Sequence, residues 1–287
     1  MANQLPIAQY LPDISCALQN HRNLVLQAEP GAGKSTLVPL HLLAADFLNG
    51  KKIVMLEPRR LAAKSIAYYL ASQLGENVGD TVGYRVRNDS KVSVKTRLEI
   101  VTEGILTRRI QNDPEMSDVG LIIFDEFHER SIHADTGLMF AVEVQQSLRD
   151  DLALLVMSAT IDTQHIARYL GGAEIISCPG RTYPVAVEYR DIDSHKPLVH
   201  SVISVLASAI NAVHEGDILV FLPGQGDINK CIDLVSEHSA DLDEMTLLPL
   251  HGSLTLEQQQ RALMPDAKGR RKVIFSTNIA ETSLTIE

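Results

Sequence analysis

The chain has 287 residues and a formal net charge of −10, so its surface as a whole does not attract nucleic acid nonspecifically, although a local basic groove is compatible with this balance. Tryptophan is absent and aromatic residues make up 5% of the chain, which disfavours a base-stacking platform. No apolar run is long enough for a membrane span, Met1–Leu11 does not look like a targeting sequence, and the scattered cysteines (Cys16, Cys178, Cys231) lack metal-ligand spacing. We therefore expect a cytoplasmic protein without a membrane partner.

The first informative segment reads as a strand, a glycine-rich turn and a helix. Asn23–Gln27 is a short apolar run typical of a buried strand, and Ser35–Leu43 has the periodicity of a helix. Gly31 and Gly33 let backbone N–H groups point at phosphate oxygens, and the start of the helix adds partial positive charge. The segment therefore predicts a phosphate-binding loop.

The residue types in this loop favour a nucleoside triphosphate as the ligand. Lys34 is expected to reach the β- and γ-phosphates, and the Ser35 hydroxyl to ligate Mg²⁺. The usual motif opens with glycine where this chain has Ala28, and a chance glycine-rich turn is the alternative. The expected nucleotide contacts from this loop are Glu29, Pro30, Gly31, Ala32, Gly33, Lys34, Ser35 and Thr36.

A basic pair follows the next predicted strand. Lys52–Glu57 reads as a strand and Leu61–Leu74 as a helix, so Arg59 and Arg60 lie at the helix start, where backbone amides and a guanidinium can hold a phosphate. A merely solvated helix start is the alternative for this pair.

Two carboxylates follow a strand that is apolar on both faces. Gly120–Phe124 predicts a central parallel strand, and Asp125 and Glu126 come at its C-terminal end, where α/β sheets place their ligands. We expect both to serve the metal site with Ser35, and Glu126 to position and deprotonate the attacking water. The alternative is that Asp125 and Glu126 are two solvated acids at a strand end without a role in catalysis.

The stretch Asp125-Glu-Phe-His128 resembles the signature of DEAH-box helicases, with Phe127 where alanine is usual. Together with the phosphate loop it looks most like the bacterial HrpB-type RNA helicases of that family. Further segments are similar to family motifs, occur in family order and cover nearly the whole chain: Pro58–Ala63 (Ia), Thr102–Leu106 (Ib), Ser158–Thr160 (III), Phe221–Ile228 (IV), and His251–Leu254 with Ser276–Ile286 (before and at V).

The resemblance implies an α/β fold with two RecA-like P-loop NTPase domains in tandem. Alternating strands and helices agree with this fold. We expect the domains at 1–175 and 184–287, joined by a turn-rich linker over Cys178–Pro184. The later predicted elements are a strand at 151–156, helices at 161–170, 197–214 and 227–238, and strands at 217–222 and 271–275.

The resemblance also assigns roles to residues. His128, Ser158 and Thr160 are expected to couple nucleotide chemistry to strand separation. Tyr69 and Leu263 are the candidates for stacking on adenine, with ordinary helix-surface or core positions as the alternative. The expected nucleic-acid contacts are Arg59, Arg60, Arg87, Thr102, Gly104, Gly224, Thr277 and Asn278.

The function implied is an ATP-dependent RNA helicase core that uses ATP and Mg²⁺, binds single-stranded RNA and is a monomer. The sequence stops near motif V, so the second domain is expected to be incomplete and turnover to be weak. A DNA-directed helicase and a nucleotide-gated binding module without turnover stay open as alternatives. Lys268–Lys272, the densest basic cluster, is expected to be a solvated hairpin or loop.

Overall fold

The structure, a computed structural model, describes residues 5–159, 163–179, 185–191, 195–212, 215–238 and 245–280. The chain divides into two compact units, Met1–Tyr183 and Pro184–Glu287, each described here by itself.

The first unit is built on a sheet with the strand order β4-β3-β5-β2-β6-β7-β1-β8, in which all neighbouring strands are parallel except β3 and β4. Every residue of β6 and β7 is buried, because these apolar strands lie in the centre of the sheet with helices over both faces. The strands are β1 (Asn23–Ala28), β2 (Lys52–Leu56), β3 (Val82–Val86), β4 (Asp89–Lys91), β5 (Leu98–Val101), β6 (Val119–Phe124), β7 (Ala153–Ser158) and β8 (Glu174–Cys178).

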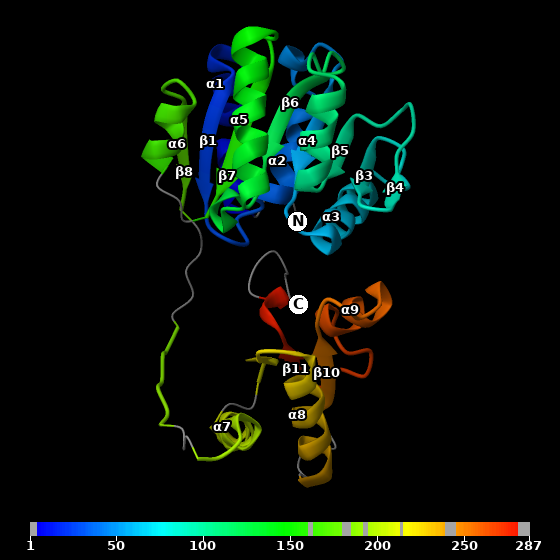
Figure 1. Cartoon of the computed structure of the whole chain (residues 1–287), viewed down its shortest axis with the longest axis vertical. Coiled ribbons are helices and arrows are strands. Elements are labelled where there is room, and N and C mark those ends of the chain that lie inside the picture. Colours follow the sequence, from blue (N-terminus) through cyan, green and yellow to red (C-terminus); the bar gives the residue numbers. More distant parts are fainter. Residues whose placement is uncertain are drawn as a thin grey trace. The chain divides into compact units, whose positions relative to one another are not determined.

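Helices cover both faces of this sheet (Figure 1), and alternate residues of its central strands enter the two cores. Leu24 and Leu26 of β1 pack on the first face, whereas Val25 packs on the opposite face. The first face carries α1 (Leu11–His21), α2 (Lys34–Leu42) and α3 (Arg60–Gln73); the other carries α4 (Glu103–Asn112), α5 (Ile132–Ser147) and α6 (Thr163–Tyr169).

The second unit has a parallel sheet of order β10-β11-β9. One face packs on α7 and α8 through residues such as Leu206, Cys231 and Phe275, and the other packs on α9 through Ala262. The elements are α7 (Leu198–Ala212), β9 (Ile218–Phe221), α8 (Gln225–His238), β10 (Thr246–Leu250), α9 (Leu256–Leu263) and β11 (Lys272–Ser276).

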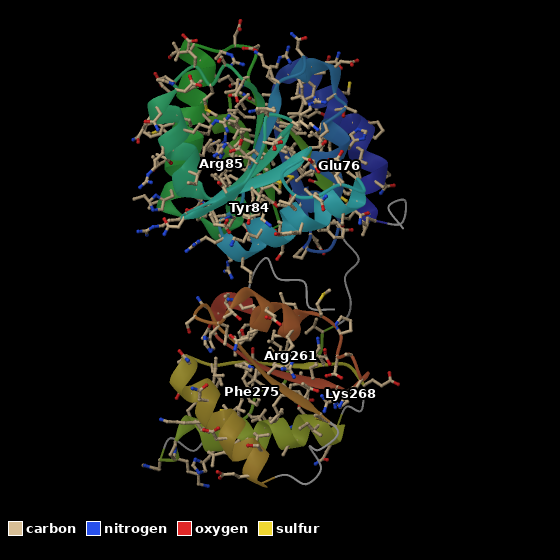
Figure 2. All side chains as sticks on the ribbon, turned by 90° about the vertical axis from the view of Figure 1, so that its right-hand side faces the viewer. Glu76, Tyr84, Arg85, Arg261, Lys268 and Phe275 are labelled. Atoms are coloured by element: carbon tan, nitrogen blue, oxygen red, sulfur yellow. The ribbon has the colours of Figure 1, made fainter. Side chains whose placement is uncertain are left out.

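The predicted α/β class is confirmed, with one antiparallel pair added by β3 and β4. The prediction that the whole Lys268–Lys272 cluster is solvated is wrong at one end. Lys268 is exposed (Figure 2), but Lys272 opens β11 and is buried, because its ammonium group donates to the carbonyls of Ala262 and Met264.

Within the part of the chain that the structure describes, no helix is both long and apolar enough to cross a membrane.

Candidate active site

The loop from β1 to α2 has the backbone geometry of a phosphate cradle. Gly31 and Gly33 have φ angles of +77° and +94°, which glycine adopts without strain. Gly33 caps α2, and its carbonyl accepts a hydrogen bond from the Thr36 hydroxyl at 3.2 Å. The Ile7 amide donates to the Ala32 carbonyl at 3.1 Å, so the N-terminal segment supports the loop, a contact that the sequence reasoning did not find.

Lys34, the first residue of α2, meets the carboxylate that follows β6. Its Nζ lies 2.7 Å from Oε1 of Glu126, and both side chains are nearly buried. Burial alone lowers the pKa of Lys34, but the charges of Asp125 and Glu126 outweigh it, so the pKa is raised. A cation is therefore firmly held where the phosphate loop and the carboxylate strand converge.

Asp125 is buried and only half satisfied. Its amide continues the sheet by donating to the Leu56 carbonyl at 3.0 Å, and its Oδ1 accepts from the Glu126 amide at 2.9 Å. Its Oδ2 has no hydrogen-bond partner among the described residues. Burial, followed by repulsion from Glu126, raises the pKa of Asp125 to about 6, although the charge of Lys34 and the hydrogen bonds from the Ser35 hydroxyl and the Glu126 amide act in the opposite direction. A buried carboxylate oxygen without a donor suits a cation or its bound water.

Glu57 is a site residue that the sequence reasoning missed. It follows β2, between β5 and β6, and its amide donates to the Val101 carbonyl at 2.9 Å. Its side chain is fully buried, and Oε2 lacks a partner in the described structure. Burial and the charges of Asp125 and Glu126 raise its pKa well above the ordinary range. Its position at a strand end, like that of Asp125, was the available signal.

These side chains could hold a metal ion only together with another ligand. In the described ranges, no group of three or more His, Cys, Asp or Glu side chains is arranged to bind a metal. Ser35, Asp125 and Glu126 therefore suit Mg²⁺ that arrives with nucleotide phosphates, because Mg²⁺ commonly combines one or two carboxylates with phosphate oxygens and water.

His128 links the carboxylate strand to the end of β7. Its Nδ1 lies 3.4 Å from Oε2 of Glu126 and accepts from the Ala159 amide at 3.4 Å. Glu126 has a φ of +49°, so a left-handed turn, rather than strand geometry, directs its side chain. Ser158 is buried at the end of β7, next to this contact, whereas Thr160 lies outside the described residues.

The predicted nucleic-acid residues of the first unit gather at the same edge of the sheet. Arg59 precedes α3 and its Nε lies 3.5 Å from Oε2 of Glu129, beside the carboxylate site. Arg60 Nη2 donates to the Arg87 carbonyl at 2.8 Å. Thr102 caps α4, and its amide donates to the Arg85 carbonyl; open space faces Gly104.

The predicted residues of the second unit follow adjacent parallel strands. Gly224 comes after β9, and its carbonyl accepts the Asp227 and Ile228 amides at the start of α8. Thr277 comes after β11 and donates its amide to the Leu250 carbonyl, with exposed Asn278 next to it.

The two candidate adenine residues differ in exposure. Tyr69 on α3 is 48% exposed, so its ring is accessible to a ligand. Leu263 is half-buried against the core under α9. Their stacking role stays a prediction.

Known proteins match this chain along nearly all of its length. The DEAD/DEAH box helicase family profile matches residues 8–168, and that of the helicase conserved C-terminal domain matches residues 201–287. The chain is 47% identical to ATP-dependent RNA helicase HrpB of Escherichia coli, covering 99% of this chain and 35% of that protein. It is 35% identical to ATP-dependent RNA helicase HrpA of Borreliella burgdorferi, covering 99% of this chain and 34% of that protein.

Solved structures agree with the sequence matches. The crystal structure of E. coli DEAH/RHA helicase HrpB superposes with a TM-score of 0.91 at 47% identity, covering 99% of this chain and 36% of that chain. The crystal structure of E. coli DExH-box NTPase HrpB gives 0.84, covering 99% of this chain and 34% of that chain. The chain thus spans about a third of the length of these relatives. The phosphate loop, the paired carboxylates and these matches establish that the chain belongs to the DEAD/DEAH box helicase family.

Proposed function

We propose that this chain binds Mg²⁺-ATP and is the two-domain core of an ATP-dependent RNA helicase, in which ATP hydrolysis drives movement on single-stranded RNA. The observation that carries the proposal is the 2.7 Å pair between Lys34 Nζ and Glu126 Oε1, beside the unsatisfied Oδ2 of Asp125. A phosphate loop and a carboxylate strand meet there in the arrangement that NTP hydrolysis needs.

The residues divide the chemistry among themselves. Backbone amides of Gly31 to Ser35 bind phosphate oxygens, and Ser35 and Asp125 hold the metal ion. When bound, Mg²⁺ supplies charge neutralisation on the phosphates. Glu126 orients the attacking water and accepts its proton, which requires that Lys34 exchange the Glu126 carboxylate for phosphate oxygens. Nucleotide binding therefore releases the base from its ion pair.

Arginines at the same sheet edge support a nucleic-acid partner. Arg59, Arg60 and Arg87 suit phosphate groups, which carry no sequence information. In the second unit, Thr277 and Asn278 contact the sugar-phosphate backbone of the nucleic acid. His128, Ser158 and Thr160 couple ATP hydrolysis to movement on RNA. Contacts of this kind give RNA and DNA equal access unless the 2′-hydroxyl is read, so the choice of RNA rests on the relatives' names.

The test is hydrolysis of Mg²⁺-ATP by the chain, with and without single-stranded RNA or DNA, compared with Glu126→Gln. We expect RNA-stimulated turnover in the wild type, and a variant that still binds a fluorescent ATP analogue but turns over at least about a hundredfold more slowly. Turnover that is measurable and equal in the two proteins would refute the role of Glu126. ATP binding without turnover in the wild type would favour the nucleotide-gated binding module, and stronger stimulation by DNA would favour a DNA-directed enzyme.

A further inference from the structure

The turn between β3 and β4 presents Arg87 at the surface. Asn88 has a φ of +65°, which closes the hairpin in two residues. The Arg87 side chain is exposed, and among the described residues no hydrogen bond or ion pair engages its guanidinium. Its carbonyl, by contrast, is held by Arg60 Nη2 at 2.8 Å. The backbone of this turn is therefore fixed while its charge remains available.

Asp89, the first residue of β4, joins the hairpin to α3. Its Oδ2 accepts from Lys64 Nζ on α3 at 2.5 Å and from the Tyr84 hydroxyl on β3 at 3.1 Å. Tyr84 is buried beneath this contact, and Figure 2 labels it on β3 beside Arg85. A second connection runs from Lys91 Nζ to the Tyr68 hydroxyl at 2.7 Å.

The charge of Asp89 is unfavourable for binding phosphate. A carboxylate two residues from Arg87 lowers the local potential and repels a polyanion. The hydrogen bond from Lys64 lowers the pKa of Asp89, so the carboxylate is ionised at neutral pH. If Asp89 favours phosphate binding, it does so through the Lys64 and Tyr84 side chains that it holds in place.

We propose that Asp89 is a positioning residue for the nucleic-acid grip of this protein. Through Lys64 and the Tyr84 hydroxyl it fixes the Arg87 turn against the start of α3, so that Arg60 and Arg87 form one preordered phosphate-binding surface. Preordering strengthens binding because less conformational freedom is lost when the RNA arrives. This inference rests on the proposed function, and specifically on the assignment of Arg87 to nucleic acid.

The direction in which Asp89→Asn changes the RNA affinity distinguishes a positioning role from a purely electrostatic one. Asp89→Asn removes a negative charge, so electrostatics alone predicts tighter binding of RNA. Loss of positioning predicts weaker binding instead, and we expect an affinity about three- to tenfold lower for a fluorescein-labelled single-stranded oligouridine, measured by anisotropy. Tyr84→Phe changes no charge and removes only the hydroxyl donor, so it should weaken binding in the same direction.

Matched controls come from the same part of the chain. Asp80→Asn removes a charge just before β3, at the strand end opposite Arg87, where the side chain accepts from the Asn77 amide, and it reports the electrostatic effect by itself. Arg87→Gln should weaken binding about tenfold. In an Arg87→Gln background, Asp89→Asn should lower the RNA affinity much less than it does in the wild type, because Asp89 acts through the contact that Arg87 makes with the RNA phosphate. Retained affinity for a fluorescent ATP analogue shows that the first unit is folded.

The outcomes are distinguishable. Unchanged or tighter RNA binding by Asp89→Asn, or full additivity with Arg87→Gln, would overturn the positioning role. If Asp89→Asn does not fold, Tyr84→Phe decides, and wild-type affinity in that variant would overturn the role as well. A wild type that binds no oligouridine, or an Arg87→Gln variant with full affinity, would instead overturn the nucleic-acid assignment on which the inference rests.

Discussion

Asp125→Asn is expected to make the nucleotide-free protein more stable and less able to use Mg²⁺-ATP. Asp125 is buried, its Oδ2 has no partner in the described structure, and its Oδ1 accepts from the Glu126 amide. Asparagine keeps that acceptor and removes the buried charge. Lys34 keeps its 2.7 Å contact with Glu126, so the substitution leaves no cation stranded.

The size and sign of the effect follow from the pKa of Asp125. It is about 6 in the folded state and 3.8 in the unfolded chain, which corresponds to about 3 kcal/mol of folding free energy. Because the folded-state pKa is the higher one, this stability is present at low pH and is lost as the pH rises from 3.8 through about 6. The advantage of asparagine should therefore be full at about pH 8 and about half as large at about pH 5.

Urea denaturation followed by far-UV circular dichroism measures this difference. Asp46→Asn removes an exposed aspartate of the same unit and should change stability by less than about 0.5 kcal/mol. Mg²⁺-ATP should stabilise the wild type but not Asp125→Asn. An asparagine variant no more stable than the wild type at about pH 8, or an advantage that does not shrink on acidification, would refute the reasoning.

Three further changes test other parts of the chain. Lys272→Ala removes a buried ammonium group that donates to the carbonyls of Ala262 and Met264 and lies 3.1 Å from Oδ2 of Asp217, so it should destabilise the second unit by about 1–3 kcal/mol in the same urea assay; an unchanged stability would contradict a structural role for this side chain. Gly83→Ala places a methyl group 2.5 Å from the Lys91 carbonyl oxygen, so the backbone must move and the thermal midpoint of unfolding should fall. An unchanged midpoint would show that the hairpin accommodates the methyl group without loss of stability. Thr277→Ala should weaken oligouridine binding about threefold with unchanged ATP affinity, and equal RNA affinity would exclude a contact from its hydroxyl.

Much of the first unit follows from local patterns. The apolar runs of β1 and β6 predict buried strands because both faces of each strand are covered. The glycine pattern predicts the phosphate loop because Gly31 and Gly33 have positive φ angles. The convergence of Lys34 with Glu126 follows from a simple rule, since the C-terminal ends of parallel strands share one edge of the sheet.

What the sequence did not reveal depends on residues distant along the chain. Glu57 is buried because β5 and β6 flank β2, an order that no local pattern specifies. Lys272 is buried because the end of α9 offers carbonyl acceptors. β4 is an Asp-Ser-Lys stretch with no strand propensity, and only pairing with β3 makes it a strand.

The position of β1 in the sheet has a consequence for folding during synthesis. β1, which carries the phosphate loop, pairs only with β7 and β8 among the described strands, so that Asn23 lies opposite Leu154 and Leu24 opposite Glu174. β1 is therefore synthesised well before the strands with which it pairs, whereas β2, β5 and β6 can pair with one another before β7 is made. Nucleotide binding by a nascent chain thus reports closure of the first unit, and we expect chains released before β7 to lack it.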